Sequence, residues 1–263
     1  MNFLSEEQWV PYHRDVLARL LALASSPASV PTHAAGVEYT SLMSCFLIQN
    51  IASAQALLSL LGAVGAEWFP VVPAFSIART VFEVDLTAHY ISRSPAERSG
   101  DYILFEHVLN KRTMDACARH RQSSDEDWRQ AMEIEWEARW RDREEQVNAE
   151  FERVREHFTI PGKYPKLYNN WSGKSLRKMA IEVGQVEAYD TFYAQLSSFS
   201  HGDIQMANRF VKLQPGGFSW SQRANWYDVG EVLHHTAVFA ASFLGLYGDE
   251  FAAWDDSAVE ACW

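Results

Sequence analysis

No Asp, Glu, Lys or Arg occurs between Tyr39 and Ala66, and this uncharged run constrains the fold more than any other feature. It is long enough to span a bilayer, which takes about 20 apolar residues. Polar residues interrupt it, however, and Gln49, Asn50 and Gln55 are the largest of them. We therefore expect the central helix of a soluble bundle, packed by protein on most sides, rather than a helix that spans a membrane.

The rest of the chain also has helical patterns and few strand signals. Pro and Gly are sparse, at 9 and 13 residues, which suits long helices. Apolar spacing and end signals predict helices at about 6–25, 34–65, 74–92, 95–121, 124–158, 186–200, 203–213 and 222–247. We expect an all-α, multi-helix bundle with long antiparallel helices. We expect a single domain, 1–263, made of an N-terminal helix and linker (1–33), a bundle core (34–247) and an acidic, aromatic tail (248–263).

The predicted helix at 124–158 is dense in charge but carries its large apolar residues on one stripe. They are spaced by threes, fours and one seven, as on one face of a long helix. The stripe is Trp128, Met132, Trp136, Trp140, Val147, Phe151, Val154 and Phe158. It either packs onto its own bundle or forms a projecting arm or the seam of a homodimer.

The composition limits which binding partners and which cellular compartment we expect. The formal net charge is −11, which argues against nucleic acid because its phosphates are repelled. The three cysteines match no metal-ligand spacing, and their odd number fits a reducing compartment. The N-terminus lacks the basic and apolar pattern of a signal peptide, so we expect a cytoplasmic protein.

One basic group stands out against this acidic background. It lies in and beside a predicted loop and comprises Lys163, Lys166, Lys174, Arg177 and Lys178. Such a group is either a site for an anion or a solvated loop, and the sequence leaves both open.

The predicted helix at 74–92 is apolar on most sides, so its charged residues need partners. Arg79 and Glu83 are four residues apart and share a face, and Asp85 and His89 form a second such pair. Arg79–Glu83 is either a structural ion pair or a site in which Arg79 binds an anionic or carbonyl group while Glu83 fixes its orientation.

A second polar stripe occurs near the end of the predicted helix at 186–200. Tyr193, Ser197 and His201 recur every four residues, and Gly202 follows as a stop signal. The helix C-terminus favours a protonated His201. Ser197 and His201 could also be a nucleophile and its base, but no third residue is in place to orient the histidine. We expect His201 to act as a base, a ligand contact or a cap.

One spacing in the sequence is typical of a metal site. Glu231 and His234 form a Glu-x-x-His pair, which carboxylate-bridged di-iron bundles use twice. This pair occurs once here, so we assign no metal ligands, and the cofactor stays unknown.

Three short motifs resemble a large, mostly bacterial, all-helical family known only as a domain of unknown function. They are R-T-V-F-E (79–83), W-S-G-K-S-L-R-K-M-A (171–180) and Y-x-x-x-S-x-x-x-H (193–201). The resemblance covers roughly 75–210. It implies a helical fold in which Arg79, Glu83, Ser197 and His201 meet, lined by Trp171 and Tyr193. Such bundles are also similar to the HEPN superfamily of RNases and defence toxins, although the Arg–His signature of those enzymes is absent.

The leading hypothesis is a buried polar pocket that binds a small anionic or carbonyl-containing ligand and, if the chain is an enzyme, transforms it. Arg79 would contact the ligand, Glu83 and His201 would be the candidate catalytic residues, and Ser197, Tyr193 and Trp171 would bind. Three alternatives stay open: a HEPN-like RNase effector, a non-catalytic oligomeric interaction protein, and a carboxylate- and His-dependent metalloenzyme. The sequence leaves open whether the chain is an enzyme.

Overall fold

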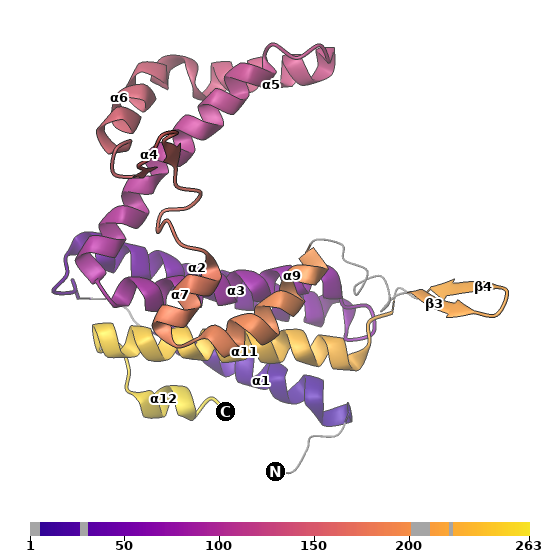
Figure 1. Ribbon diagram of the computed structural model, residues 1–263. Helices are drawn as coiled ribbons and strands as arrows, with labels where there is room; N and C mark the ends of the chain where they lie inside the picture. The colour runs from indigo at the N-terminus through magenta and orange to yellow at the C-terminus, as the bar shows by residue number, and fades with distance from the viewer. Residues whose placement is uncertain (1–5, 27–30, 201–210, 221–222) are drawn as a thin grey trace. The chain divides into compact units, whose positions relative to one another are not determined.

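The computed structural model describes residues 6–26, 31–200, 211–220 and 223–263, and the chain divides into two compact units (Figure 1). Unit 1 comprises Met1–Pro95 and Leu176–Trp263, and unit 2 comprises Ala96–Ser175. The described elements are helices apart from two short hairpins, which confirms the predicted all-α class. That the two units form one domain stays a prediction.

Unit 1 is built on two long helices, α3 (Val71–Ser92) and α11 (Trp226–Phe251), which lie side by side (Figure 1). α1 (Glu6–Ala24) packs against α11, and α2 (Val37–Val64) packs against α3. The remaining helical elements are α7 (Leu176–Val183), α8 (Val186–Ala188), a π-helical turn (Tyr189–Tyr193), α9 (Ala194–Ser200) and α12 (Asp256–Glu260). Of these, α7 and α9 pack against α3.

The core of unit 1 lies between α3 and α11. Phe75, Phe82 and Phe243 are fully buried. The rings of Phe82 and Phe239 meet edge to face, with 4.8 Å between their centroids. Burying one such side chain contributes roughly 2–3 kcal/mol. The helix predicted at 74–92 is therefore central, as its all-round apolar pattern indicated.

α2 differs from the expectation that protein would pack it on most sides. It buries one face, through Tyr39, Met43 and Leu57, while Ile48 is 64% exposed. Only 28% of its most apolar window is buried, against 67% for α11. The difference arises because α3 and α11 occupy the centre. Both α2 and α11 are long and apolar enough to cross a membrane. This is weak evidence for a membrane span, because the core helices of soluble proteins share the property.

The end of the predicted helix at 203–213 is a strand instead. Residues 201–210 lie outside the described part, but β3 (Val211–Gln214) pairs antiparallel with β4 (Gly217–Trp220). Pro215 and Gly216 make the turn between the strands, and Gly216 has φ +89°. Pro followed by a left-handed Gly suits a type II turn, so local turn chemistry ends the helical pattern here.

Unit 2 contains α4 (Pro95–His120), α5 (Glu126–Arg139), a 3₁₀ turn (Arg141–Arg143), α6 (Glu144–Val154) and the hairpin of β1 (Thr159–Ile160) and β2 (Lys166–Leu167). The single helix predicted at 124–158 is wrong, because the chain breaks after Arg139 into two separate helices (Figure 1). The break lets both halves of the apolar stripe pack in the same unit as α4.

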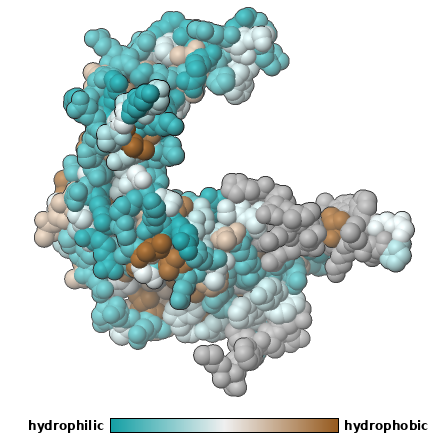
Figure 2. All heavy atoms as spheres, viewed as in Figure 1, coloured by the Kyte–Doolittle hydropathy of each residue, from teal (hydrophilic) through white to brown (hydrophobic). Residues whose placement is uncertain are grey.

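The stripe forms two small cores in unit 2. One contains Phe105, Val108, Phe151, Val154 and Phe158, and the other contains Met114, Cys117, Trp136, Trp140 and Val147. This is the arrangement expected if the stripe packs onto its own helices. Trp128 is the exception and is 48% exposed. The surface over α5 and α6 is mostly hydrophilic in the view of Figure 2. A dimer stays a prediction.

Gly230 on α11 provides a test of the α1–α11 packing. A Cβ built there would lie 1.6 Å from Cδ1 of Trp9 on α1. We therefore expect Gly230→Ala to displace the indole and lower the free energy of unfolding by about 1–3 kcal/mol, as overpacking does. Urea denaturation followed by circular dichroism measures this.

The matched control is Gly245→Ala on the same helix. A Cβ at Gly245 meets no atom within 4 Å. Alanine should therefore stabilise the helix by up to about 1 kcal/mol. Equal effects of the two substitutions would contradict the close approach of Trp9.

Candidate functional site

Arg79, Glu83 and Tyr193 form a closed hydrogen-bonded cluster in unit 1. Arg79 Nε donates to Glu83 Oε1 at 2.8 Å, and Arg79 Nη2 donates to the Tyr193 hydroxyl at 2.9 Å. The Tyr193 hydroxyl in turn donates to Glu83 Oε1 at 3.0 Å. The Arg79 and Glu83 side chains are 23% and 35% exposed, so the cluster is half-buried rather than buried as expected. Solvent therefore reaches this polar cluster.

The helical geometry of α3 and the π-helical turn together place the three side chains. Arg79 and Glu83 are one turn apart on α3. Tyr193 ends the π-helical turn, and its ring stacks on Tyr189 with 4.8 Å between centroids. The Arg79 guanidinium also lies 5.1 Å from the centre of the Tyr193 ring. π-helical turns often occur at functional sites.

The cluster holds its groups in defined protonation states. Burial raises the pKa of Tyr193, and the charge of Glu83 raises it further, to about 12. Burial lowers the pKa of Arg79, but its hydrogen bond to Glu83 and the attraction of that carboxylate outweigh burial, and the pKa rises above its usual value. At neutral pH the cluster therefore contains a protonated Arg79 and a neutral Tyr193 hydroxyl.

The structure describes two of the three other predicted site residues, and these two belong to different units. Ser197 is half-buried on α9, one turn after Tyr193. His201 lies outside the described residues. Trp171 belongs to unit 2, where its ring meets Tyr102 at 5.2 Å between centroids. The meeting of Trp171 and His201 with Arg79 thus stays a prediction.

A second polar cluster on α3 includes a partner that the sequence did not indicate. Asp85 is 1% exposed and accepts a hydrogen bond from Gln185 Nε2 at 3.0 Å. His89 Nε2 lies 3.2 Å from Asp85 Oδ1, at ion-pair distance, and 3.1 Å from Ser242 Oγ. Burial lowers the pKa of His89, but the hydrogen bond and charge of Asp85, together with Ser242, raise it, so the pKa lies above its usual value. Gln185 and Asp85 are too far apart in sequence for periodicity to link them.

Three histidines cluster between α1 and α11. The ring centroids of His13 and His234 are 4.6 Å apart, and those of His234 and His235 are 5.6 Å apart. Burial, together with the charge of the neighbouring His234, lowers the pKa of His13 to about 4 and that of His235 to about 3. Neither ring nitrogen of His13 has a hydrogen-bond partner among the described residues. The cluster is therefore neutral at physiological pH.

The described residues contain no group of three or more His, Cys, Asp or Glu side chains arranged to hold a metal ion. Glu231 accepts a hydrogen bond from Gln195 Nε2 at 2.8 Å, while His234 packs against His13 and Trp9. Glu231 and His234, the two members of the Glu-x-x-His pair, thus contact different residues.

Removing the Tyr193 hydroxyl tests the polar cluster. Tyr193→Phe keeps the stacked ring but removes one hydrogen bond to each of Arg79 and Glu83. We expect the free energy of unfolding to fall by about 1–3 kcal/mol, since both lost bonds involve charged groups. Chemical denaturation measures the change.

Tyr189→Phe is the matched control, because it makes the same chemical change in the stacked neighbouring ring. No hydrogen bond of the Tyr189 hydroxyl occurs in the described part of the chain, so its effect should be below about 0.5 kcal/mol. A larger loss from Tyr189→Phe than from Tyr193→Phe would contradict the closed cluster.

The histidine cluster predicts a loss of stability in acid. The pKa of His13 is about 4 in the folded state and 6.5 in a free histidine, so protonation favours the unfolded chain. The free energy of unfolding should be insensitive to this group above about pH 7. Between pH 6.5 and 4 it should fall by on the order of 3 kcal/mol from His13 alone.

Urea denaturation at a series of pH values measures this loss, and His13→Leu should reduce it. Trp9→Phe is the control, since it changes a neighbouring ring that does not titrate and should lower stability equally at every pH. An unchanged pH dependence in His13→Leu would show that His13 is not the group responsible.

Comparison with known proteins identifies the family but assigns no reaction. Residues 40–218 match the family of unknown function DUF5677, which extends beyond the 75–210 of the three motifs. No curated protein and no solved structure matches the chain. Because the match covers more than half of the sequence, the chain belongs to the family of unknown function DUF5677.

Proposed function

We propose that the Arg79–Glu83–Tyr193 cluster binds a small ligand through a carbonyl or carboxylate group. One observation carries the proposal: the three side chains are joined in a closed cycle while Arg79 and Glu83 remain partly exposed. A structural ion pair has no need of solvent access, whereas a binding site requires it. A cluster already held in one geometry also loses little conformational entropy on binding.

The charge of the cluster favours weakly charged ligands. Arg79 and Glu83 cancel, so a ligand that carries several negative charges gains little here. Both hydrogen bonds to Glu83 go to Oε1, which leaves Oε2 without a hydrogen-bond partner in the described structure. A ligand with a carbonyl or carboxylate for Arg79 and a neighbouring N–H or O–H for Glu83 would match both groups.

The remaining roles rest on the sequence. Glu83, and His201 from the end of the same polar stripe as Tyr193, would be the candidate proton acceptors or donors if a reaction occurs. Ser197 would offer a hydroxyl one turn from Tyr193, and Trp171 an apolar wall. The RNase, oligomeric and metalloenzyme alternatives stay predictions, and no contact among the described residues favours one of them.

Three probes of one shape test the proposal. Benzoate and benzamide carry a carboxylate and a carbonyl, and benzylamine carries a cation on a comparable ring. We expect benzoate or benzamide to raise the melting temperature at millimolar concentration, since ligand binding to the folded state stabilises it. Benzylamine should have no effect.

Arg79→Gln should abolish this stabilisation relative to the same variant without ligand. Arg177→Gln is the control, because Arg177 forms an exposed two-bond pair with Asp190 and lies outside the cluster. Stabilisation that persists in Arg79→Gln, or that is equal for all three probes, would refute the proposal.

A further inference from the structure

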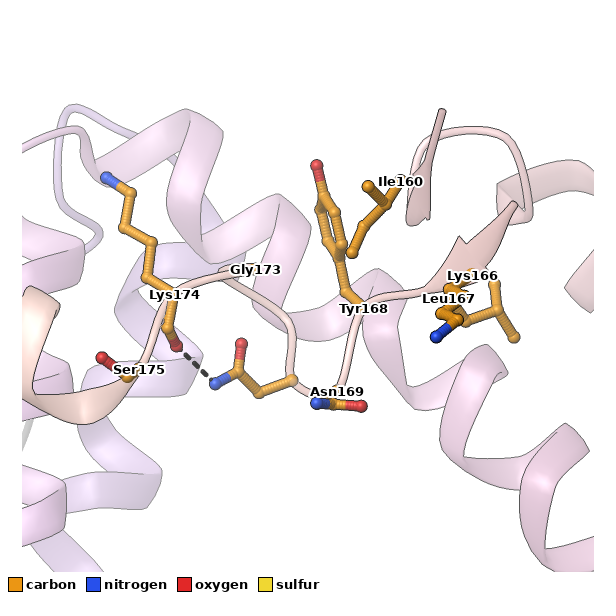
Figure 3. A pocket seen from close by; sticks show the side chains of 9 residues that line it. Ile160, Lys166, Leu167, Tyr168, Asn169, Gly173, Lys174 and Ser175 are labelled. Atoms are coloured by element: carbon orange, nitrogen blue, oxygen red, sulfur yellow. Dashed lines mark hydrogen bonds between the residues drawn. The ribbon is translucent and has the colours of Figure 1, made fainter. Parts of the chain in front are cut away.

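Unit 2 has a small pocket beside the β1–β2 hairpin and a larger one between α4 and α5. In the small pocket the ring of Tyr168 lies beside Ile160, and Asn170 Nδ2 donates to the Lys174 carbonyl oxygen at 2.6 Å (Figure 3). Its volume is about 270 Å³, whereas the α4–α5 pocket has about 450 Å³ and falls within the usual range for small-molecule sites. The α4–α5 pocket is therefore the better candidate for a ligand.

Small side chains on α4 make room for the α4–α5 pocket. The residues that line it from α4 share one face of the helix, with spacings i, i+3, i+4 and i+7: Thr113, Ala116, Cys117 and His120. Because three of these side chains are small, they leave space between the two helices. The fourth, His120, packs edge to face on Trp128 of α5, with 5.9 Å between ring centroids. These two rings form one end of the pocket.

The side of the pocket that α5 provides is larger and mostly apolar. The lining residues Trp128, Ala131, Met132 and Glu135 have the same i, i+3, i+4 and i+7 spacing. Ile134 also lines the pocket and is 64% exposed, while Trp128 is 48% exposed. Trp128 belongs to neither of the two cores of unit 2. Large apolar side chains that remain in contact with water at a pocket offer a surface that a ligand can cover.

Hydrogen bonds between the two helices hold the pocket in shape. Cys117 Sγ on α4 donates to the Met132 carbonyl oxygen on α5 at 3.3 Å. Arg121 Nε and Nη2 donate to the two carboxylate oxygens of Glu133 at 2.5 and 2.9 Å. Because these contacts exist without a ligand, binding costs less conformational entropy than it would in a pocket that must first form.

A carboxylate gives the pocket its charge. Glu135 lines it, and among the described residues that line it there is no Lys or Arg. The charge of Glu135 is felt on the α4 side, since burial and then this carboxylate raise the pKa of the Cys117 thiol. Glu135 pairs with Arg139 at 3.5 Å, and both side chains are well exposed to solvent. Such a pair is weak and leaves the carboxylate able to bind a second cation.

The spacing of residues on α5 sets the length of a matching ligand. Trp128 and Glu135 are seven residues apart, which is about 10 Å along the helix. Ala131 and Met132 lie between them on the same face, so the surface that joins the indole to the carboxylate is apolar. A ligand that uses the whole face therefore has a cation at one end and an apolar group at the other.

We propose that the α4–α5 pocket binds an elongated apolar monoamine, with its ammonium group beside Glu135 and its apolar end against Trp128. The apolar chain between the two ends would lie along Met132. The single carboxylate in the lining matches a single positive charge. The proposal is independent of the Arg79 cluster, which belongs to unit 1.

Isothermal titration of the full chain with phenylbutylamine tests the proposal, because its ammonium group and ring are separated by a chain of comparable length. We expect it to bind more tightly than phenylbutanol, which lacks the charge, and than butylamine, which lacks the ring. Benzylamine is too short to reach both Glu135 and Trp128 and should not bind detectably. No binding of phenylbutylamine at millimolar concentration, or equal binding of phenylbutanol, would overturn the proposal.

Two substitutions test the two ends of the pocket. Glu135→Gln should weaken the binding of phenylbutylamine roughly fivefold, the upper end for an exposed ion pair. Trp128→Ala should weaken it roughly tenfold, because the apolar end loses its contact. Glu152→Gln is the matched control, since Glu152 forms an exposed ion pair with Arg155 but does not line the pocket. It should change the affinity less than about twofold, and equal weakening by Glu152→Gln would contradict the assignment.

Reversing the charge of the pocket gives a test that loss of stability cannot imitate. Glu135→Lys should weaken phenylbutylamine and should make phenylbutyrate, the carboxylate of the same shape, bind more tightly than it does to the unmodified chain. An unchanged preference for the amine would refute the role of Glu135.

Sedimentation velocity of the same samples tests whether a second copy of the chain occupies the pocket instead. We expect Trp128→Ala to leave the sedimentation coefficient unchanged. A dimer that Trp128→Ala converts to a monomer would assign the exposed indole to a protein interface and overturn the proposal.

Discussion

α3 packs against α11 through fully buried rings such as Phe82, and the rest of unit 1 is arranged around this contact. A helix that is apolar on most sides has little surface left on which to place a charge. Each polar residue on α3 must therefore find a partner or lie at the edge of the packed region. Arg79 and Glu83 are at the edge and half-exposed, whereas Asp85 is buried and has Gln185 as its donor.

The partners of these residues come from a segment about a hundred positions later. Gln185 contacts Asp85, and Tyr193 contacts both Arg79 and Glu83. These hydrogen bonds fix where the α8–α9 segment docks on α3, while Phe82 packs against Tyr193 with 5.5 Å between ring centroids. The same contacts thus position the segment and build the candidate site, so a substitution at Tyr193 affects stability and the candidate site together.

Local sequence patterns predicted most of the helices and, within the polar cluster, the pairing of Arg79 with Glu83. The four-residue spacing of Arg79 and Glu83 was enough to place them on one face, and their ion pair is present at 2.8 Å. Gln185 could not have been predicted as the partner of Asp85, because one contact between residues far apart in the sequence leaves no periodic pattern. The break after Arg139 had one sequence signal: the stripe skips from Trp140 to Val147, which is the point where the helix ends and restarts.

The Arg79 cluster carries no net charge for a physical reason. It lies on a core helix, where an uncompensated cation would be costly, so Glu83 accompanies Arg79 and the net charge is zero. A ligand with several negative charges therefore gains little from this cluster. The geometry of the hydrogen-bonding groups, rather than charge, decides which ligand the cluster would select.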